Sequence, residues 1–283
     1  MKFARLRTPD GTRPVVVSGD EAYDLSELLG DISPTTMDLL DSAAVAAANG
    51  KLNAVDLAGA EFEAPISRTG AVIAIGMNYA AHAAESGSAP PLMPVMFLKT
   101  PNTVAAPDDP FVIQARSVKT DWEVELAMVI KKRAYELGDD DDPLDYVAGF
   151  TIANDLSERT FQLEESGGQW SKGKCAPGST PLGPWLVTTD DVDAGALRLR
   201  SFVNDEPRQD SSTADMIFDC PTIIRHLSQY LALEPGDVVL TGTPEGVALS
   251  GRFPYLRPGD VVRIEIEGLG SQTQRMAAPG ANG

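Results

Sequence analysis

Three carboxylates alternate with apolar residues in the stretch KTDWEVELAMVI, residues 119–130. A period of two is typical of a β-strand, so Asp121, Glu123 and Glu125 should share one face. The apolar residues that should share the opposite face are Trp122, Val124, Leu126 and Met128. Carboxylates about 7 Å apart along a strand repel one another unless a cation or water neutralises them. The stretch therefore predicts a cation-binding strand or, if the face is exposed, a solvated edge.

A further carboxylate, Asp155, follows the apolar run in VAGFTIANDLSER, at the point where a predicted strand becomes a loop. Side chains at such positions often belong to functional sites. Glu123, Glu125 and Asp155 together would form an all-oxygen ligand set, which suits hard cations such as Mg²⁺, Mn²⁺ or Ca²⁺. Zinc is disfavoured, because nitrogen and sulfur ligands are scarce in a chain with two histidines and two cysteines.

One of the two histidines, His82, lies in GMNYAAHAAESG, where YAAHAAE predicts one or two helical turns. Glu85 is three residues further on, so the two side chains share a helix face and can touch. A carboxylate orients an imidazole and increases its basicity, as a general base requires. The alternative is a surface ion pair. The second histidine, His226, falls in the amphipathic stretch TIIRHLSQYL and is best explained as a packing or surface residue.

Several other polar residues lie close to these stretches and could contact an anionic substrate. Arg159 and Gln162 follow Asp155, and Lys99 ends the apolar run VMFLK. Lys174 lies in the Gly-rich stretch QWSKGK. A lysine in such a loop can bind an anionic group as a point charge, although each of these residues taken singly is better explained as an ordinary surface residue.

The elements that must position these residues indicate a strand-rich α+β fold. Residues 1–65 should form a small domain, in which PDG joins two strands and residues 33–50 form a helix capped by Ser33 or Thr35 and ended by Gly50. From residue 70 to 283, short apolar runs alternate with Pro/Gly-rich turns. The clearest helix in this larger domain is CPTIIRHLSQYLAL.

The composition excludes several classes of function. The 283 residues carry a net charge of −18, which argues against a nucleic-acid or anionic-membrane surface. We find no apolar run of the ~18 residues that a membrane span needs, and the first residues lack a signal-peptide core. Two cysteines do not make a disulfide framework, so we expect a cytoplasmic protein with reduced thiols.

Taken in order along the chain, these stretches resemble the fumarylacetoacetate hydrolase (FAH) family. The fragments that carry the resemblance are IGMNYAAHAAE, MFLK, DWEVELAMVI, VAGFTIANDLSERTFQ, QWSKGKC, PLGPWLVT, VND, RQDSSTADMIF and LEPGDVVLTGTPEGV. They span residues 70–270. The resemblance departs at CAPGST, where the family often has an aspartate-containing segment, and after GV in TGTPEGVALSGRF, where a second glycine is common.

The resemblance implies a mixed β-roll catalytic domain beside a small N-terminal α/β domain, a homodimer and a bound Mg²⁺ or similar cation. By motif match, Glu123, Glu125 and Asp155 take the metal-ligand positions. Two further sets follow from the same match. The catalytic positions fall on His82, Glu85 and Lys174, and the substrate-binding positions on Arg159, Gln162, Lys99 and Thr243.

The combined prediction is a divalent-metal-dependent hydrolase that cleaves a C–C bond in an acylpyruvate or related 1,3-dicarbonyl 2-oxo acid. The cation would stabilise an enolate, and His82 held by Glu85 would deprotonate water. The alternatives are a decarboxylase, a hydroxymuconate-type isomerase, an oxaloacetate keto–enol tautomerase, or a binding protein without activity. Residues 78–90 carry the His–Glu pair in a Gly/Ala/Ser-rich stretch, which predicts a mobile lid.

Overall fold

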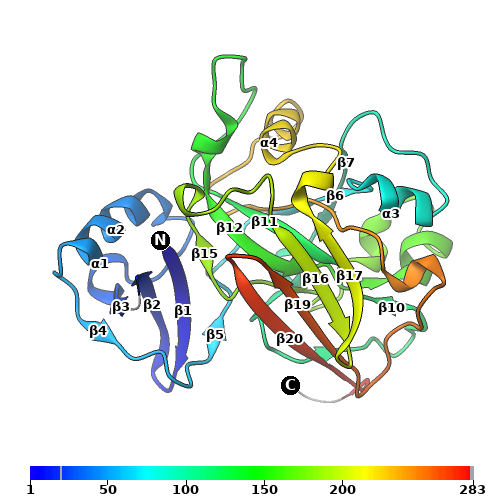
Figure 1. Ribbon diagram of the computed structural model, residues 1–283, viewed down its shortest axis with the longest axis horizontal. Helices are drawn as coiled ribbons and strands as arrows, with labels where there is room; N and C mark the ends of the chain where they lie inside the picture. Colours follow the sequence, from blue (N-terminus) through cyan, green and yellow to red (C-terminus); the bar gives the residue numbers. More distant parts are fainter. Residues whose placement is uncertain (20, 281–283) are drawn as a thin grey trace.

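The computed structural model describes residues 1–19 and 21–280, and it has the strand-rich α+β architecture expected from the sequence (Figure 1). The α-helices are α1 Ser26–Leu29, α2 Leu40–Ala48, α3 Ala80–Glu85 and α4 Cys220–Ser228. The strands are β1 Lys2–Thr8, β2 Gly11–Ser18, β3 Glu21–Asp24, β4 Ala54–Val55, β5 Phe62–Glu63, β6 Val72–Gly76, β7 Val95–Lys99, β8 Val104–Ala105, β9 Phe111–Val112, β10 Thr120–Asp121, β11 Val124–Ile130, β12 Val147–Asn154, β13 Ser157–Glu158, β14 Thr180–Pro181, β15 Leu186–Val187, β16 Arg198–Val203, β17 Glu206–Ser212, β18 Val238–Leu240, β19 Val261–Ile266 and β20 Gly270–Ala277. Short helical turns are η1 Met37–Leu39, η2 Pro101–Thr103, η3 Pro143–Tyr146, η4 Thr160–Glu164, η5 Trp170–Gly173, η6 Thr189–Asp191, η7 Thr213–Asp215 and η8 Ala248–Ser250.

The N-terminal residues form the predicted hairpin and helix. β1 and β2 pair antiparallel around the PDG turn, and η1 continues into α2. The predicted helix cap is wrong. Ser33 and Thr35 precede the helical turn η1, and its N-cap residue, Thr36, donates its hydroxyl to the carbonyl of Asp31 at 2.8 Å rather than capping the helix. The predicted end is correct, because Gly50 adopts a φ of +64°, which favours glycine.

A large mixed sheet runs through the whole molecule in the order β4-β3-β2-β1-β15-β12-β11-β18-β6-β7. β1 pairs with β15, so the N-terminal strands and the larger part of the chain share this sheet. A buried apolar cluster also extends across both parts, from Phe3 and Val16 to Ala127 and Val129. The division into domains at residues 65–70 stays a prediction.

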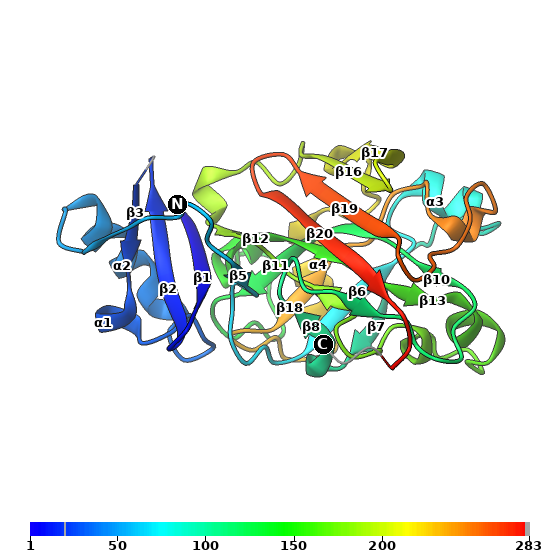
Figure 2. The same cartoon turned by 90° about the horizontal axis from the view of Figure 1, so that it is seen from below.

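β11 lies near the middle of this sheet and is buried along its whole length. The predicted apolar face is correct, since Val124, Leu126 and Met128 are fully buried in the main core cluster. A second, five-stranded sheet in the order β17-β16-β19-β20-β9 covers that face. Figure 2 shows β19 and β20 lying across β11 and β12. The carboxylates Glu123 and Glu125 lie on the face of the large sheet that the second sheet does not cover, and they are buried there as well.

The predicted helix at CPTIIRHLSQYLAL is α4, which ends at Ser228 and is shorter than the sequence suggested. The Asp219 side chain caps it by accepting the N–H of Thr222 at 2.9 Å, and Ile223 and Leu227 bury its apolar face. Within the described part of the chain, no helix combines the length and apolar character needed to cross a membrane.

Candidate active site

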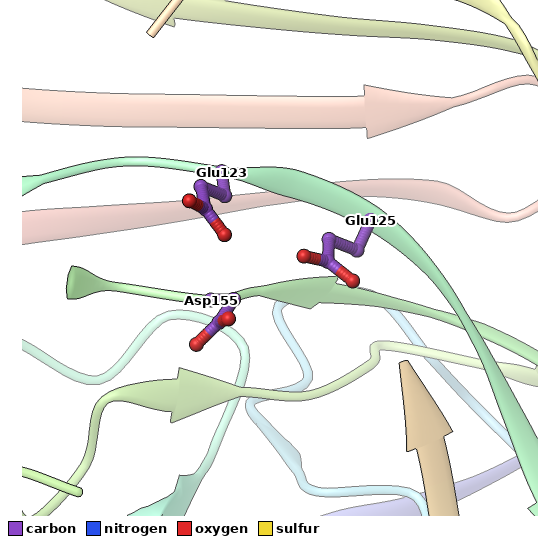
Figure 3. A group of neighbouring side chains, drawn as sticks. All are labelled: Glu123, Glu125 and Asp155. Carbon is purple, nitrogen blue, oxygen red and sulfur yellow. The ribbon is translucent and has the colours of Figure 1, made fainter. Parts of the chain in front are cut away.

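The three carboxylates predicted to bind metal meet at one buried point (Figure 3). Glu123 immediately precedes β11, Glu125 is its second residue, and Asp155 immediately follows β12. β11 and β12 pair antiparallel with Val124 opposite Asn154, which brings these ends together. One oxygen from each carboxylate lies within 4.8 Å of the others, and all three residues are buried. The solvated-edge alternative is therefore wrong, because β11 lies inside the sheet and these carboxylates are buried.

Asp121 does not join this group, although the sequence placed it on the same strand face. The strand breaks at Trp122 and Glu123, between β10 and β11. The Asp121 carboxylate turns to accept the N–H groups of Ala248 and Leu249 at 2.8 and 2.9 Å. It also accepts a hydrogen bond from the Nε of Arg159 at 2.8 Å. Because the strand is interrupted here, Asp121 binds Arg159 and the loop at residues 248–249 instead of joining the carboxylate group.

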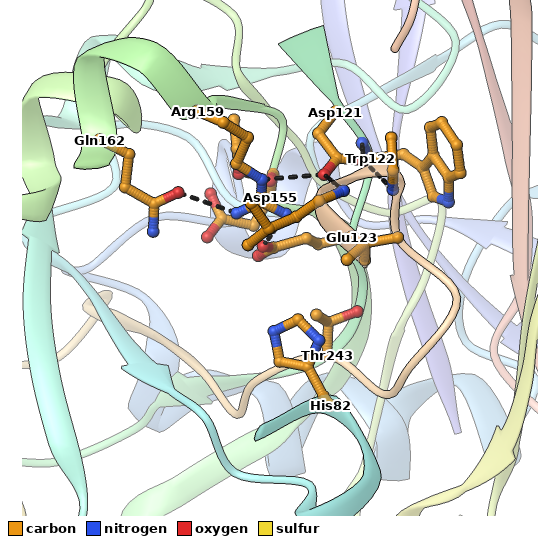
Figure 4. Close-up of polar contacts among 12 residues, drawn as sticks. His82, Asp121, Trp122, Glu123, Asp155, Arg159, Gln162 and Thr243 are labelled. Atoms are coloured by element: carbon orange, nitrogen blue, oxygen red, sulfur yellow. Dashed lines mark hydrogen bonds and ion pairs between the residues drawn. The ribbon is translucent and has the colours of Figure 1, made fainter. Parts of the chain in front are cut away.

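Arg159 connects this anchor to the carboxylate group (Figure 4). Its Nη2 lies 2.7 Å from Oε1 of Glu123, and its Nη1 donates to Oε1 of Gln162 at 2.8 Å. Gln162 belongs to the π-helical turn η4, one turn after Arg159. Both residues line the same cavity as Glu123, so the structure brings these two predicted substrate-binding side chains to the site.

Lys174 lies between two of the carboxylates. Its Nζ is 2.7 Å from Oε2 of Glu123 and 2.6 Å from Oδ2 of Asp155. Burial tends to lower the pKa of this ammonium group, but Asp155 and Glu123 outweigh burial and the pKa is raised. Lys174 therefore remains protonated and lines the cavity as a fixed positive charge.

Lys99 requires a correction. It was expected to contact substrate, yet its side chain is fully buried and is not among the residues that line the cavity. The ammonium group forms an ion pair with Asp155 and donates to the carbonyl of Ser179 at 2.9 Å. Lys99 ends β7, whose alternation points it inward behind Asp155. Lys99 therefore pairs with Asp155, a candidate metal ligand, and does not contact the space that a substrate would occupy.

Glu125 differs from its two neighbours because no described lysine or arginine forms an ion pair with it. One of its oxygens accepts the N–H of Gly242 at 2.7 Å. Burial raises the pKa of Glu125 well above its ordinary value, and the charges of Asp155 and Glu123 add to this. Burial also acts to raise the pKa of Glu123, but Lys174 and Arg159 outweigh it and that pKa is lowered. The cluster thus contains one buried carboxylate that a cation would neutralise.

The His–Glu pair forms on α3 as predicted. Nδ1 of His82 lies 3.0 Å from Oε1 of Glu85, and the N–H of Gly246 donates to both Glu85 oxygens at 3.1 Å. A carboxylate only accepts hydrogen bonds, so Nδ1 carries a proton, and in the neutral imidazole the lone pair is then on Nε2. His82 is buried and lines the cavity, on the side opposite Arg159 and Gln162 (Figure 4). The surface ion-pair alternative is therefore wrong.

Thr243 also lines the cavity, but its hydroxyl is already bound. Oγ1 donates to the carbonyl of Val124 at 2.9 Å and accepts from Nε2 of Gln209 at 2.8 Å. Gln209 in turn accepts the N–H of Val124 at 3.1 Å, so this network fixes the start of β11. A substrate contact by Thr243 would use its remaining lone pair.

These side chains surround one cavity of about 190 Å³. Polar groups of His82, Glu123, Glu125, Arg159 and Lys174 converge on it, with apolar walls between them. A small concave site with a few convergent polar groups is typical of small-molecule binding.

The model of the family described as Fumarylacetoacetate (FAA) hydrolase C-terminal matches residues 71–277. The protein belongs to the FAH family. A Burkholderia multivorans protein, named provisionally as a hydrolase, is 42% identical over 97% of this chain and 98% of its own.

Two solved FAH-family structures resemble the whole chain. Maleylpyruvate hydrolase from Sphingobium sp. SYK-6, solved with manganese(II) and pyruvate, is 30% identical with a TM-score of 0.80, over 99% of this chain and 100% of its own. A 5-carboxymethyl-2-hydroxymuconate delta-isomerase from Mycobacterium smegmatis is 33% identical with a TM-score of 0.79, over 99% and 100%. The family assignment and the expected fold are thereby confirmed.

Trp170 and Gln209 are among the residues of this FAH-family site that were missed from the sequence. Trp170 forms part of the cavity wall and packs edge-on against Phe97, with ring centroids 5.9 Å apart. A Cβ atom at Gly76 would lie 2.4 Å from this indole, so the glycine in IGMNY makes room for it. Gln209, in RQDSS, holds Thr243 from the second sheet. Both lie in fragments that carried the family resemblance, which was the available signal.

Proposed function

We propose that this protein is a divalent-metal-dependent hydrolase that cleaves the C–C bond of an acylpyruvate or a related 2-oxo acid. The single observation that carries the proposal is the placement of the His82–Glu85 pair in the same small cavity as Glu123 and Glu125. A metal site alone would serve several reactions of 2-oxo acids. A histidine with a free Nε2 beside that site adds the base that hydrolysis needs.

Glu123, Glu125 and Asp155 would hold the cation. Their oxygens are hard ligands, they converge within 4.8 Å, and Glu125 lacks a neutralising partner among the described residues. The structural neighbour with manganese supports a divalent ion, and Mg²⁺, Mn²⁺ or Ca²⁺ all suit such ligands. When bound, the cation would chelate the 2-oxo carboxylate end of the substrate and act as a Lewis acid on the developing enolate.

The protein side chains would perform the proton transfers and the addition of water. His82 Nε2 takes a proton from water, whose oxygen adds to the distal carbonyl carbon, while Glu85 stabilises the imidazolium. The bond from that carbon to the adjacent methylene then breaks, and its electron pair passes into the pyruvate enolate. The proton returns to the methylene carbon, giving pyruvate and a carboxylic acid. Lys174, Arg159 and Gln162 would hold the negative charge at the pyruvate end.

Incubation with acetylpyruvate in ¹⁸O-labelled water tests the reaction class. We expect Mg²⁺- or Mn²⁺-dependent release of pyruvate, with one label in the acetate. Chelation should abolish turnover, and restoring the ion should recover it. Full activity in the chelated protein, or failure of every acylpyruvate offered with metal, would contradict the proposal.

The isomerase among the structural neighbours supports a second candidate, isomerisation of a hydroxymuconate-type diacid at the same site. Decarboxylation or keto–enol tautomerisation of oxaloacetate would also use the same ligands. None of these reactions needs a water-activating base, and none creates a new carboxyl group that carries an oxygen from water. Product analysis in labelled water therefore separates them from hydrolysis.

A homodimer in the cytoplasm remains our expectation for the assembly and its location. Exposed apolar side chains support self-association, because Leu92, Met93, Met96 and Leu98 lie along the loop before β7 and on that edge strand. Strand edges with exposed apolar groups favour pairing with another chain. Light scattering should give twice the chain mass, and Leu98→Asp should lower it towards that of a single chain.

A further inference from the structure

One wall of the cavity is apolar toward its opening. Leu163, the residue after Gln162 on η4, lines it while its side chain is 47% exposed, whereas Glu123 and Glu125 are at most 4% exposed. Leu163 therefore lies at the mouth and the carboxylates at the base. Leu249 and Trp170 also line the cavity as uncharged walls. A substrate whose 2-oxo acid end sits at the base would point its other end toward this apolar mouth.

The positive charges in the cavity are already bound to acidic side chains. His82 apart, the cationic side chains among the described residues that line it are Arg159 and Lys174. Arg159 pairs with Asp121 and Glu123, and Lys174 pairs with Glu123 and Asp155. Neither guanidinium nor ammonium is free to neutralise a second carboxylate at the mouth. A buried, unpaired carboxylate is costly, and the net charge of −18 adds to its repulsion.

Two serines after α3, Ser86 and Ser88, line the cavity, and the hydroxyl of Ser86 is the buried one. The hydroxyl of Ser86 lines the cavity, is buried, and has no hydrogen-bond partner among the described residues. Ser86 caps α3 with its N–H bonded to the carbonyl of His82 at 3.1 Å, so the two side chains share a face one turn apart. A buried hydroxyl without a partner loses stability unless a ligand oxygen binds it.

From these observations we propose that the mouth of the cavity is an uncharged acyl subsite. Its apolar wall, represented by Leu163 and Leu249, contacts the acyl chain, and the Ser86 hydroxyl donates to the oxygen of the distal carbonyl. The substrate is then a monocarboxylate with a neutral acyl end and not a dicarboxylate. This inference rests on the proposed hydrolase function and narrows its substrate class. It distinguishes this protein from structural neighbours named for substrates with two or more carboxylates.

A matched pair of substrates tests the subsite. Butyrylpyruvate and succinylpyruvate have chains of equal length and differ in a terminal methyl against a terminal carboxylate. We expect kcat/KM to be at least about tenfold higher for butyrylpyruvate, because burying the unpaired carboxylate is unfavourable. Calorimetry with the Mn²⁺-loaded protein provides a readout without turnover, and 2-oxohexanoate should bind more tightly than 2-oxoadipate.

Three variants test the residues. Leu163→Arg places a cation at the mouth and should raise kcat/KM for succinylpyruvate. The ratio of kcat/KM for butyrylpyruvate to that for succinylpyruvate should therefore fall about tenfold. Ser86→Ala removes the donor and should lower kcat/KM for butyrylpyruvate about tenfold. Ala84→Ser is the control, because it changes a solvent-exposed position of the same helix and should leave the kinetics unchanged.

The results separate this inference from the function on which it rests. Equal or faster turnover of succinylpyruvate, with equal binding of 2-oxoadipate, would overturn the uncharged subsite while the hydrolase function stands. Unchanged kinetics in Ser86→Ala would remove Ser86 from the subsite. If neither acylpyruvate is cleaved with metal and neither 2-oxo acid binds, the proposed function fails first.

Discussion

Oε1 of Glu85 lies 3.0 Å from Nδ1 of His82, and both oxygens of Glu85 are fixed by the N–H of Gly246. The loop that contains Gly246 thus holds the carboxylate, and the carboxylate holds the imidazole, which would leave Nε2 to act on a substrate in the proposed reaction. The contact also connects α3 to the loop after β18. Whether residues 78–90 are mobile without ligand stays a prediction.

His82→Ala should lower acylpyruvate hydrolysis by about 10²–10⁴-fold, the usual contribution of a general base. Metal affinity should change little, because His82 is not among the candidate ligands. Glu85→Gln should have a smaller effect, since the imidazole remains and loses only its orienting charge. Steady-state kinetics and calorimetry measure both quantities.

The control for this prediction is the second histidine. His226, on α4, packs at a tilt against Tyr230, with ring centroids 5.0 Å apart, and does not line the cavity. His226→Ala should retain wild-type kinetics. If His82→Ala hydrolyses acylpyruvate at the wild-type rate, the base is misassigned, and the isomerase or decarboxylase alternatives move ahead.

Metal binding should stabilise the fold. At a metal concentration about 100 times Kd, a site present only in the folded state contributes about 2.7 kcal/mol. For a chain of this size, that corresponds to a rise in Tm of roughly 5–10 °C. Glu125→Gln should lose most of this rise. Without metal the variant should be as stable as the wild type or more stable, because glutamine still accepts the Gly242 N–H and removes one repelling charge.

Differential scanning fluorimetry with and without Mn²⁺ measures both effects. Glu206→Gln changes an exposed carboxylate that pairs with Arg208, and it should leave the metal-induced rise intact. A full rise in Glu125→Gln would show that Glu125 is not a ligand. A large loss of stability without metal would show that its charge is neutralised in some other way.

The two cysteines should differ in reactivity. Cys220 is 2% exposed, and burial raises the pKa of its thiol to about 12, so it remains protonated at pH 8. Cys175 is partly exposed, next to Lys174. Ellman's reagent should therefore titrate one thiol in the native protein and two in guanidinium chloride. Cys175→Ser should abolish the native reaction, and a native reaction that persisted in this variant would mean that Cys220 is accessible.

The sequence predicted the features that depend on local pattern. Alternation in β11 identified both its apolar face and its carboxylates, and the spacing of His82 and Glu85 predicted their contact. It could not predict the break before β11 that turns Asp121 away, because the break depends on Arg159 and on the loop at Ala248. The position of Lys99 behind Asp155 depends in the same way on the pairing of distant strands.

Lys99 provides the last prediction, because its position distinguishes two roles. Lys99→Met removes one partner of a fully buried ion pair, which typically costs about 3–5 kcal/mol. Without metal, the variant should therefore unfold at a Tm lower by roughly 6–20 °C. A bound cation would supply the missing positive charge near Asp155, so the metal-induced rise in Tm should exceed that of the wild type.

KM should change little in the metal-loaded variant, since Lys99 does not reach the cavity. Lys172→Met, at an exposed position two residues before Lys174, should behave as the wild type in both assays. A variant of Lys99 that kept full stability and showed only a raised KM would instead place this lysine in contact with substrate.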